Sequence, residues 1–345
     1  MFGGKKNFLV VFYGLGVLIL FVLGMNMFNI FYMWMMMEFV FFVVILFLIK
    51  YSKGEMNLGG VIFYLFVQAL GGVLFLSSML VEVFYFGNYY YLGSSVCLGC
   101  LYLSIMGVML KVGMFPFYLQ VYQIMSFINF EQILLFMLYP KIIPVILVYS
   151  MFSQLDLGGG ALMFSFLVMA ISAFQGIKSS DMRELLAWSG VGQLGWIFVS
   201  ALGAFSSFVF FFWLYFFMLM GLCFLIGEGG SKLFFDFFSV RGSLQNRYTG
   251  LFLVFFMSGL APFLMFYVKL FLIYSLECFS MGLIMGVLLG VLGMSLFYVR
   301  ILQILMCSGS VFFFQSSISK GSALKGYAKF LFFFFFCFGG ALFLV

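Results

Sequence analysis

Four charged residues lie inside stretches that otherwise have the composition of membrane spans: Glu38, Lys111, Lys141 and Lys269. A charge near the centre of a bilayer costs about 3 kcal/mol or more. Membrane proteins keep such charges where they pair with one another, face a wet cavity or take part in transport. Carboxylate and ammonium groups held in apolar surroundings can exchange protons, so these four residues predict a proton or ion path.

Glu38 and Lys141 each lie near the middle of a long apolar run, which places both close to the midplane of a membrane. The charge of a buried carboxylate depends on its partners, so Glu38 can respond to a nearby lysine. Pro140 and Pro144 flank Lys141 and free backbone carbonyls, so helix breaks and water or polar groups are expected there. The structural alternatives are a buried ion pair or a neutral acid for Glu38, and a lysine that extends to the membrane surface for Lys141.

The other two lysines each lie beside a predicted interruption of a helix. Proline removes a backbone donor and pushes the preceding turn out of the helix. Interrupted helices occur at membrane depth where protein or water satisfies the freed backbone groups, and in transporters they mark the working region. The interruptions are Gly113 and Pro116 after Lys111, and Gly259 and Pro262 before Lys269.

These residues are positioned by a chain of 345 residues that is 66% hydrophobic and 8% charged, with a mean hydropathy of +1.26. Continuous apolar runs of this kind predict an all-α polytopic membrane protein, and residues 1–345 form one membrane domain without a soluble domain. The predicted spans are Phe8–Leu23, Phe28–Ile49, Leu58–Ser78, Leu92–Tyr122, Glu131–Tyr149, Gly159–Gly176, Leu185–Ala204, Phe208–Ile226, Leu251–Leu276, Gly282–Leu305 and Ala328–Val345, about 11 transmembrane helices in all.

The basic residues predict the orientation of these spans. With the N-terminus inside, every Lys and Arg outside the spans falls in an inner loop or near the inner end of a span. This distribution follows the positive-inside rule and places the C-terminus outside. The net charge of +6 therefore reflects topology and does not indicate nucleic acid as a partner.

The equipment for redox or hydrolytic chemistry is missing from the sequence. The chain has no histidine, and its six cysteines include one close pair, Cys97 and Cys100. There is no glycine-rich phosphate loop, no nucleophile with a histidine base and no cysteine cluster for an iron–sulfur centre. The driving force must come from a partner or from an ion gradient.

Six segments, in order along the chain, carry a resemblance to a known family. They are Trp34 with Glu38, Tyr64 to Ala69, Leu110 to Tyr118, Lys141 to Pro144, Asp181 to Trp196, and Ser258 to Lys269. Together they resemble subunit 2 of mitochondrial NADH:ubiquinone oxidoreductase (respiratory complex I), one of its antiporter-like membrane subunits. The resemblance covers nearly the whole chain and implies an antiporter-like fold with two broken helices.

The resemblance implies a proton-translocating core subunit that couples NADH:ubiquinone electron transfer to proton pumping, and hence a subunit of an H⁺-translocating NADH:ubiquinone reductase. Glu38 and Lys111 would form a carboxylate–lysine pair, Lys141 would be the central relay and Lys269 the group at the far end. The chain itself would bind no cofactor and no metal, since FMN, iron–sulfur clusters and ubiquinone belong to partner subunits.

The implied partners are the other membrane-arm subunits of complex I, including antiporter-like and accessory subunits, and lipids such as cardiolipin. The implied location is the mitochondrial inner membrane, with the N-terminus in the matrix. Scarce Thr, Pro and His, whose codons are rich in C and A, indicate an organelle-encoded gene.

Some positions depart from the family pattern. Tyr118 and Gln193 stand where the family usually has histidine, and Glu184, next to Arg183, stands for a basic residue. These four residues are candidates for a secondary polar relay. Without histidine, proton transfer must use Lys, Glu, Tyr and water.

Two other classes of function fit part of this pattern. A stand-alone cation/proton antiporter of the related multisubunit type would share the lysine–glutamate array and need no redox partner. A purely structural membrane scaffold would leave four buried charges unexplained.

Overall fold

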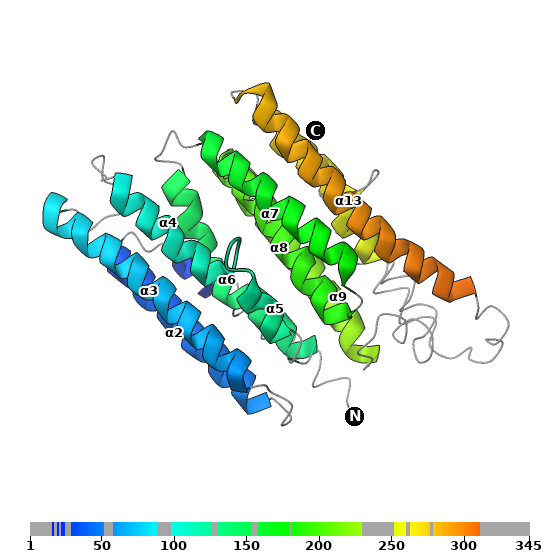
Figure 1. The fold of residues 1–345 in the computed structure, drawn as a ribbon, viewed down its shortest axis with the longest axis horizontal. Helices are drawn as coiled ribbons and strands as arrows, with labels where there is room; N and C mark the ends of the chain where they lie inside the picture. The colour runs from blue at the N-terminus through cyan, green and yellow to red at the C-terminus, as the bar shows by residue number, and fades with distance from the viewer. Residues whose placement is uncertain are drawn as a thin grey trace. The chain divides into compact units, whose positions relative to one another are not determined.

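The computed structural model describes residues 29–51, 58–87, 98–125, 128, 130–152, 158–179, 181–229, 252–259, 263–276 and 279–310, together with 16, 19–20 and 22–24. Within these ranges the chain forms helices joined by turns, which confirms the all-helical prediction for this part (Figure 1). Most of the first predicted span and all of the eleventh lie outside the described residues. The chain divides into two compact units, residues 1–158 and 159–345.

The first unit contains five described helices, which coincide with predicted spans two to five. They are α2 (Ile30–Tyr51), α3 (Leu58–Phe86), α4 (Leu98–Val112), α5 (Leu119–Met125) and α6 (Phe130–Phe152). Helix α3 packs against α4, while α6 packs against both α2 and α4. In Figure 1, α2 and α3 run side by side. Residues 141–148 of α6 are all buried, so α6 forms the interior of this unit.

Helices α3 and α4 approach each other through glycine. A Cβ added at Gly71 of α3 would lie 3.0 Å from the carbonyl oxygen of Gly107. A Cβ at Gly107 of α4 would lie 2.8 Å from the carbonyl oxygen of Gly71. Small residues allow membrane helices to pack backbone against backbone, and here they bring the last turn of α4 close to α3.

The helix is interrupted between α4 and α5, where the sequence predicts a break. Gly113 adopts a φ of 73°, in the left-handed region that favours glycine. The backbone N–H groups of Gly113 and Met114 both donate to the carbonyl of Met109, at 3.0 and 3.2 Å, and close the end of α4. Pro116 lies in the following turn, before α5 begins at Leu119.

Helix α6 departs from the sequence prediction, because it continues through both Pro140 and Pro144. The prediction of helix breaks at these two prolines is wrong. Each proline removes a single backbone donor, and the remaining helical hydrogen bonds hold the segment together. Intramembrane helices tolerate proline where neighbouring groups satisfy the backbone carbonyls that it frees.

The second unit contains α7 (Gly158–Lys178), α8 (Met182–Ala201), α9 (Phe205–Gly229), a helical segment at residues 252–258, α12 (Leu264–Tyr274) and α13 (Met281–Ser310). Residues 185–201 of α8 are all buried, and α8 packs against α9 and α12. The segment 252–258 ends at Gly259, whose φ is 68°. Pro262 lies outside the described residues, and α12 starts at Leu264.

Three helical stretches of the described chain are long and apolar enough to cross a membrane: Gly59–Tyr85, Gly159–Lys178 and Met281–Arg300. Five shorter apolar helices of 10–17 residues accompany them. These findings support a membrane protein. The number of crossings and the orientation of the termini stay predictions.

Candidate functional site

In the first unit, the side chains of Glu38 on α2 and Lys111 on α4 form an ion pair. Lys111 Nζ lies 2.6 Å from Glu38 Oε1. The side chains are 3% exposed for Lys111 and 19% exposed for Glu38. A charge-assisted hydrogen bond of this length balances the buried charge of Lys111 with the partly buried charge of Glu38. The roles of the two residues in proton transfer stay predictions.

The ion pair fits because Gly72 of α3 has no side chain. A Cβ added there would overlap Glu38 Oε1 and lie 3.3 Å from Lys111 Nζ. The pair is therefore seated directly against the backbone of α3. The pattern of charges did not single out Gly72, since its role depends on the contact between helices.

We expect the substitution Gly72→Ala to push Glu38 away from Lys111 and to lower stability by about 1–3 kcal/mol, the usual cost of overpacking a core. Thermal unfolding of the purified assembly measures this change. The control is Gly60→Ala on the same helix, where the nearest atom to a new Cβ is the carbonyl oxygen of Gln123 at 3.9 Å. Equal melting temperatures for the two variants would contradict the prediction.

Two buried glutamines cover the carbonyl end of α4. Gln68 Nε2 donates to the carbonyl oxygen of Lys111 at 3.0 Å and to Gln120 Oε1 at 3.3 Å. Gln120 Nε2 donates to the carbonyl oxygen of Leu110 at 2.5 Å. Carbonyls freed by the break thus find donors inside the protein, as they must at membrane depth. Gln68 belongs to a predicted motif, whereas sequence reasoning missed Gln120.

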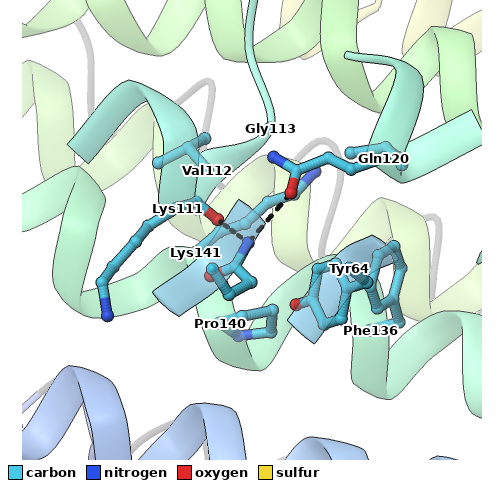
Figure 2. Close-up of a pocket in the computed structure, with 10 residues that line it drawn as sticks. Tyr64, Lys111, Val112, Gly113, Gln120, Phe136, Pro140 and Lys141 are labelled. Carbon is cyan, nitrogen blue, oxygen red and sulfur yellow. Dashed lines mark hydrogen bonds between the residues drawn. The ribbon is translucent and has the colours of Figure 1, made fainter. Parts of the chain in front are cut away.

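A small cavity of about 10 Å³ lies between this amide network and Lys141 (Figure 2). That volume has room for about one water molecule. Lys141 is 4% exposed, and its Nζ lies 3.7 Å from the sulfur of Met137, a weak acceptor. The cavity is lined by Tyr64, Gln68, Lys111, Val112, Gly113, Gln120, Val121, Phe136, Pro140 and Lys141. Lys141 and the Lys111 break therefore border the same space.

In the second unit, Lys269 of α12 reaches back to the broken helix before it. Its Nζ donates to the carbonyl oxygen of Ser258 at 3.3 Å and lies 5.2 Å from the centre of a Trp196 ring on α8. The residue is 5% exposed. A helix carbonyl end and an aromatic face both favour a cation. Among the described residues, no carboxylate forms a salt bridge with Lys269.

Gly259 makes room for the Lys269 ammonium, because a Cβ there would lie 2.8 Å from Lys269 Nζ. We expect Gly259→Ala to displace the Lys269 ammonium. The variant should therefore lose more proton translocation than backbone strain at this position would cause by itself. Gly87→Ala isolates that strain, since Gly87 has a similar φ of 65° and open space around a new Cβ. Proton translocation and thermal unfolding of both variants are compared. Matching losses in the two would contradict this role of Gly259.

The candidates for a secondary polar relay fall at three places along the chain. Tyr118 is half-buried in the turn after α4. Arg183 is buried in the first turn of α8, and Glu184 is half-buried beside it. Gln193, further along α8, is buried and donates to the carbonyl oxygen of Met257 and to the hydroxyl of Tyr298, both at 3.3 Å. The hydrogen bond to Met257 connects Gln193 to the helical segment that ends at Gly259, near Lys269.

Curated proteins similar in sequence to this chain include several with the same name. NADH-ubiquinone oxidoreductase chain 2 of Strongylocentrotus purpuratus is 26% identical over 149 residues, 42% of this chain and 40% of the relative. The same protein of Myosorex kihaulei is 20% identical over 134 residues, 39% of this chain and 38% of the relative. The chain thus matches about 40% of the length of these relatives. No family model matches the sequence.

Solved structures share the fold over most of the chain. A chain of the membrane-bound sulfane sulfur reductase, an archaeal respiratory membrane complex, has a TM-score of 0.74 at 15% identity, covering 90% of this chain and 70% of that chain. A chain of the Mrp complex from Dietzia sp. has a TM-score of 0.70 at 15% identity, covering 89% and 61%. A chain of respiratory complex I from Thermus thermophilus has a TM-score of 0.68 at 13% identity, covering 86% and 75%.

The relatives match about 40% of this chain, and the solved structures cover 86–90% of it. At such low identity the solved structures establish the fold, and the relatives establish the similarity of sequence. The resemblance predicted from the motifs is confirmed: the chain is similar to NADH-ubiquinone oxidoreductase chain 2 and has a helical fold found in respiratory membrane complexes.

Proposed function

We propose that this chain is a proton-translocating membrane subunit of respiratory complex I. The observation that carries the proposal is the set of three buried lysines, of which Lys111 alone pairs with a carboxylate among the described residues. Buried ammonium groups are costly and mark ion or proton pathways in membrane proteins. Their placement at two helix breaks and beside a small cavity supports the same role.

The pair Glu38–Lys111 would respond to the redox reaction in partner subunits. A change in the charge or position of Glu38 alters the stability of the Lys111 ammonium, because the two groups are in contact. Lys141, which borders the cavity below the Lys111 backbone, would take up or release a proton in turn. Lys269 would be the terminal group, with its ammonium stabilised by a carbonyl and an aromatic ring. Water would connect these groups.

The membrane location, topology and partners of the chain are also proposed. It would cross the mitochondrial inner membrane eleven times, with the N-terminus in the matrix and the gene in the organelle. It would contact other membrane-arm subunits, accessory subunits and lipids such as cardiolipin. Partner subunits would hold FMN, iron–sulfur clusters and ubiquinone. The chain itself would hold no cofactor.

The second candidate is a stand-alone cation/proton antiporter subunit of the related multisubunit type. The likeness of fold to a chain of the Mrp complex, at a TM-score of 0.70, favours this alternative. Such a protein would use the same buried charges and an ion gradient in place of a redox partner.

Native electrophoresis of gently solubilised source membranes, with mass spectrometry of each band, separates the two candidates. Comigration of this chain with NADH dehydrogenase activity in a very large assembly supports the complex I function. A small complex that lacks this activity would replace it with the antiporter function.

A further inference from the structure

We propose that Gln68 and Gln120 are positioning residues that form an amide latch, which holds the carbonyl end of α4 until the ammonium of Lys141 displaces Gln120. The latch deepens the proposed function and rests on it. It assigns a role to two neutral side chains in controlling when the central lysine carries a proton.

The latch consists of two hydrogen bonds to the carbonyl end of α4 and a third between the two glutamine side chains. Gln68 binds the carbonyl of Lys111 and the side chain of Gln120, and Gln120 binds the carbonyl of Leu110. Both side chains are buried, with exposed fractions of 2% and 1%. The carbonyl end of a helix carries partial negative charge, which attracts cations. The amides hold this end without bringing in a charge of their own.

The second unit shows what a lysine does at such an end. There the carbonyls of Met257 and Ser258 lie just before Gly259 and accept from Gln193 and Lys269. Counted back from the glycine that ends each helix, Met257 corresponds to Lys111, and both carbonyls accept from a glutamine. The second unit therefore shows a buried ammonium bound to the carbonyl end of a broken helix beside a glutamine amide, and in the first unit we assign the carbonyl of Leu110 as the acceptor that a lysine could take from Gln120.

Lys141 is the lysine placed to do so. It borders the same cavity as Gln120, and among the described residues the one hydrogen-bond partner of its ammonium is the sulfur of Met137. A carbonyl is a far better acceptor than a thioether, and a charged donor binds it more strongly than an amide does. The cavity has room for about one water molecule, and this space would let the flexible lysine side chain move toward Gln120.

The exchange would link Lys141 to the ion pair. Lys111 contributes its carbonyl to the latch and its ammonium to Glu38. When a charged Lys141 displaces Gln120, the Gln68 amide loses one of its two partners and keeps only the carbonyl of Lys111. The position of the Lys111 backbone would then depend on whether Lys141 is charged. Besides Lys141, the titratable side chains that line the cavity are Tyr64 and Lys111, and Lys111 is paired with Glu38. Tyr118 and Tyr122 flank Gln120 along the chain.

The test measures proton translocation against pH in membrane vesicles that contain the intact assembly. In the variant Gln120→Leu, the carbonyl oxygen of Leu110 loses its side-chain donor and keeps the backbone N–H of Gly113 at 3.3 Å. Its second lone pair can then accept from the Lys141 ammonium, so Lys141 holds its proton more tightly. The pH of half-maximal activity is expected to rise by about one unit, the scale of a hydrogen bond to a charged group. Gln120→Glu keeps the shape of the side chain and adds a negative charge, so a larger rise is expected.

Gln123→Leu is the matched control, because Gln123 lies one turn further along α5 and is exposed. An unchanged or lowered half-maximal pH in both Gln120 variants, or the same rise in the control, overturns the latch. If Gln120→Leu does not assemble, the near-isosteric Gln120→Glu decides alone. Normal pumping by the variant Lys141→Met refutes the proposed function itself. If Lys141→Met fails to pump but the pH dependence of pumping is unchanged in the Gln120 variants, only the latch is refuted.

Discussion

Replacing Lys141 with methionine is expected to stop proton translocation while the assembly remains folded. Methionine fills a similar volume and carries no charge, and removing a buried ammonium with a single weak hydrogen-bond partner leaves no other charge unpaired. The rate of pumping should fall by about 100-fold or more, as for other groups that transfer protons. The measurement is proton uptake by vesicles per NADH oxidised, together with the melting temperature of the assembly.

Lys178→Met is the control for this experiment. Lys178 is an exposed residue at the end of α7, and its ammonium lies over the ring of Phe174 at 4.1 Å. Loss of this lysine should leave pumping within about twofold of the unsubstituted chain, as is usual for surface positions. Normal pumping by Lys141→Met would instead support a structural role for the buried lysine.

The second large effect is expected from the pair Glu38 and Lys111. The substitution Glu38→Gln leaves the Lys111 ammonium buried without its counter-charge, which costs about 3–5 kcal/mol. The double variant Glu38→Gln with Lys111→Met removes both charges and should recover most of this stability. It should still fail to pump, because the charge that responds to the partner subunits is gone.

Unfolding of the four members of this double-mutant cycle gives the coupling energy of the pair. Glu82→Gln serves as the control, since Glu82 is a half-buried carboxylate elsewhere on α3. Additive effects of the two substitutions would show that the ion pair contributes nothing specific. Pumping by the stable double variant would show that the pair is structural.

The sequence predicts the features that depend on local chemistry. Charges stand out in an apolar run, and a glycine followed by proline ends a helix whatever surrounds it, so the break after Lys111 lies where it was predicted. Two prolines around Lys141 did not end their helix, because a helix in an apolar interior loses more by unwinding than by missing two donors.

Features that depend on contacts between helices could not be predicted in this way. Gly72 matters only because α2 and α4 bring two charged side chains to that point of α3. Gln120 matters because Gln68 of another helix lies within reach of it. Neither residue differs from an ordinary glycine or glutamine until the packing is known.

Trp196 has a further consequence through its contact with Lys269. The indole lies 5.2 Å from a lysine nitrogen that the proposed mechanism protonates and deprotonates. The Trp196 side chain is fully buried. A charge at that distance shifts the electronic transitions of an indole. If Lys269 titrates as proposed, the ultraviolet emission of Trp196 would report the electric field of a single proton on that lysine.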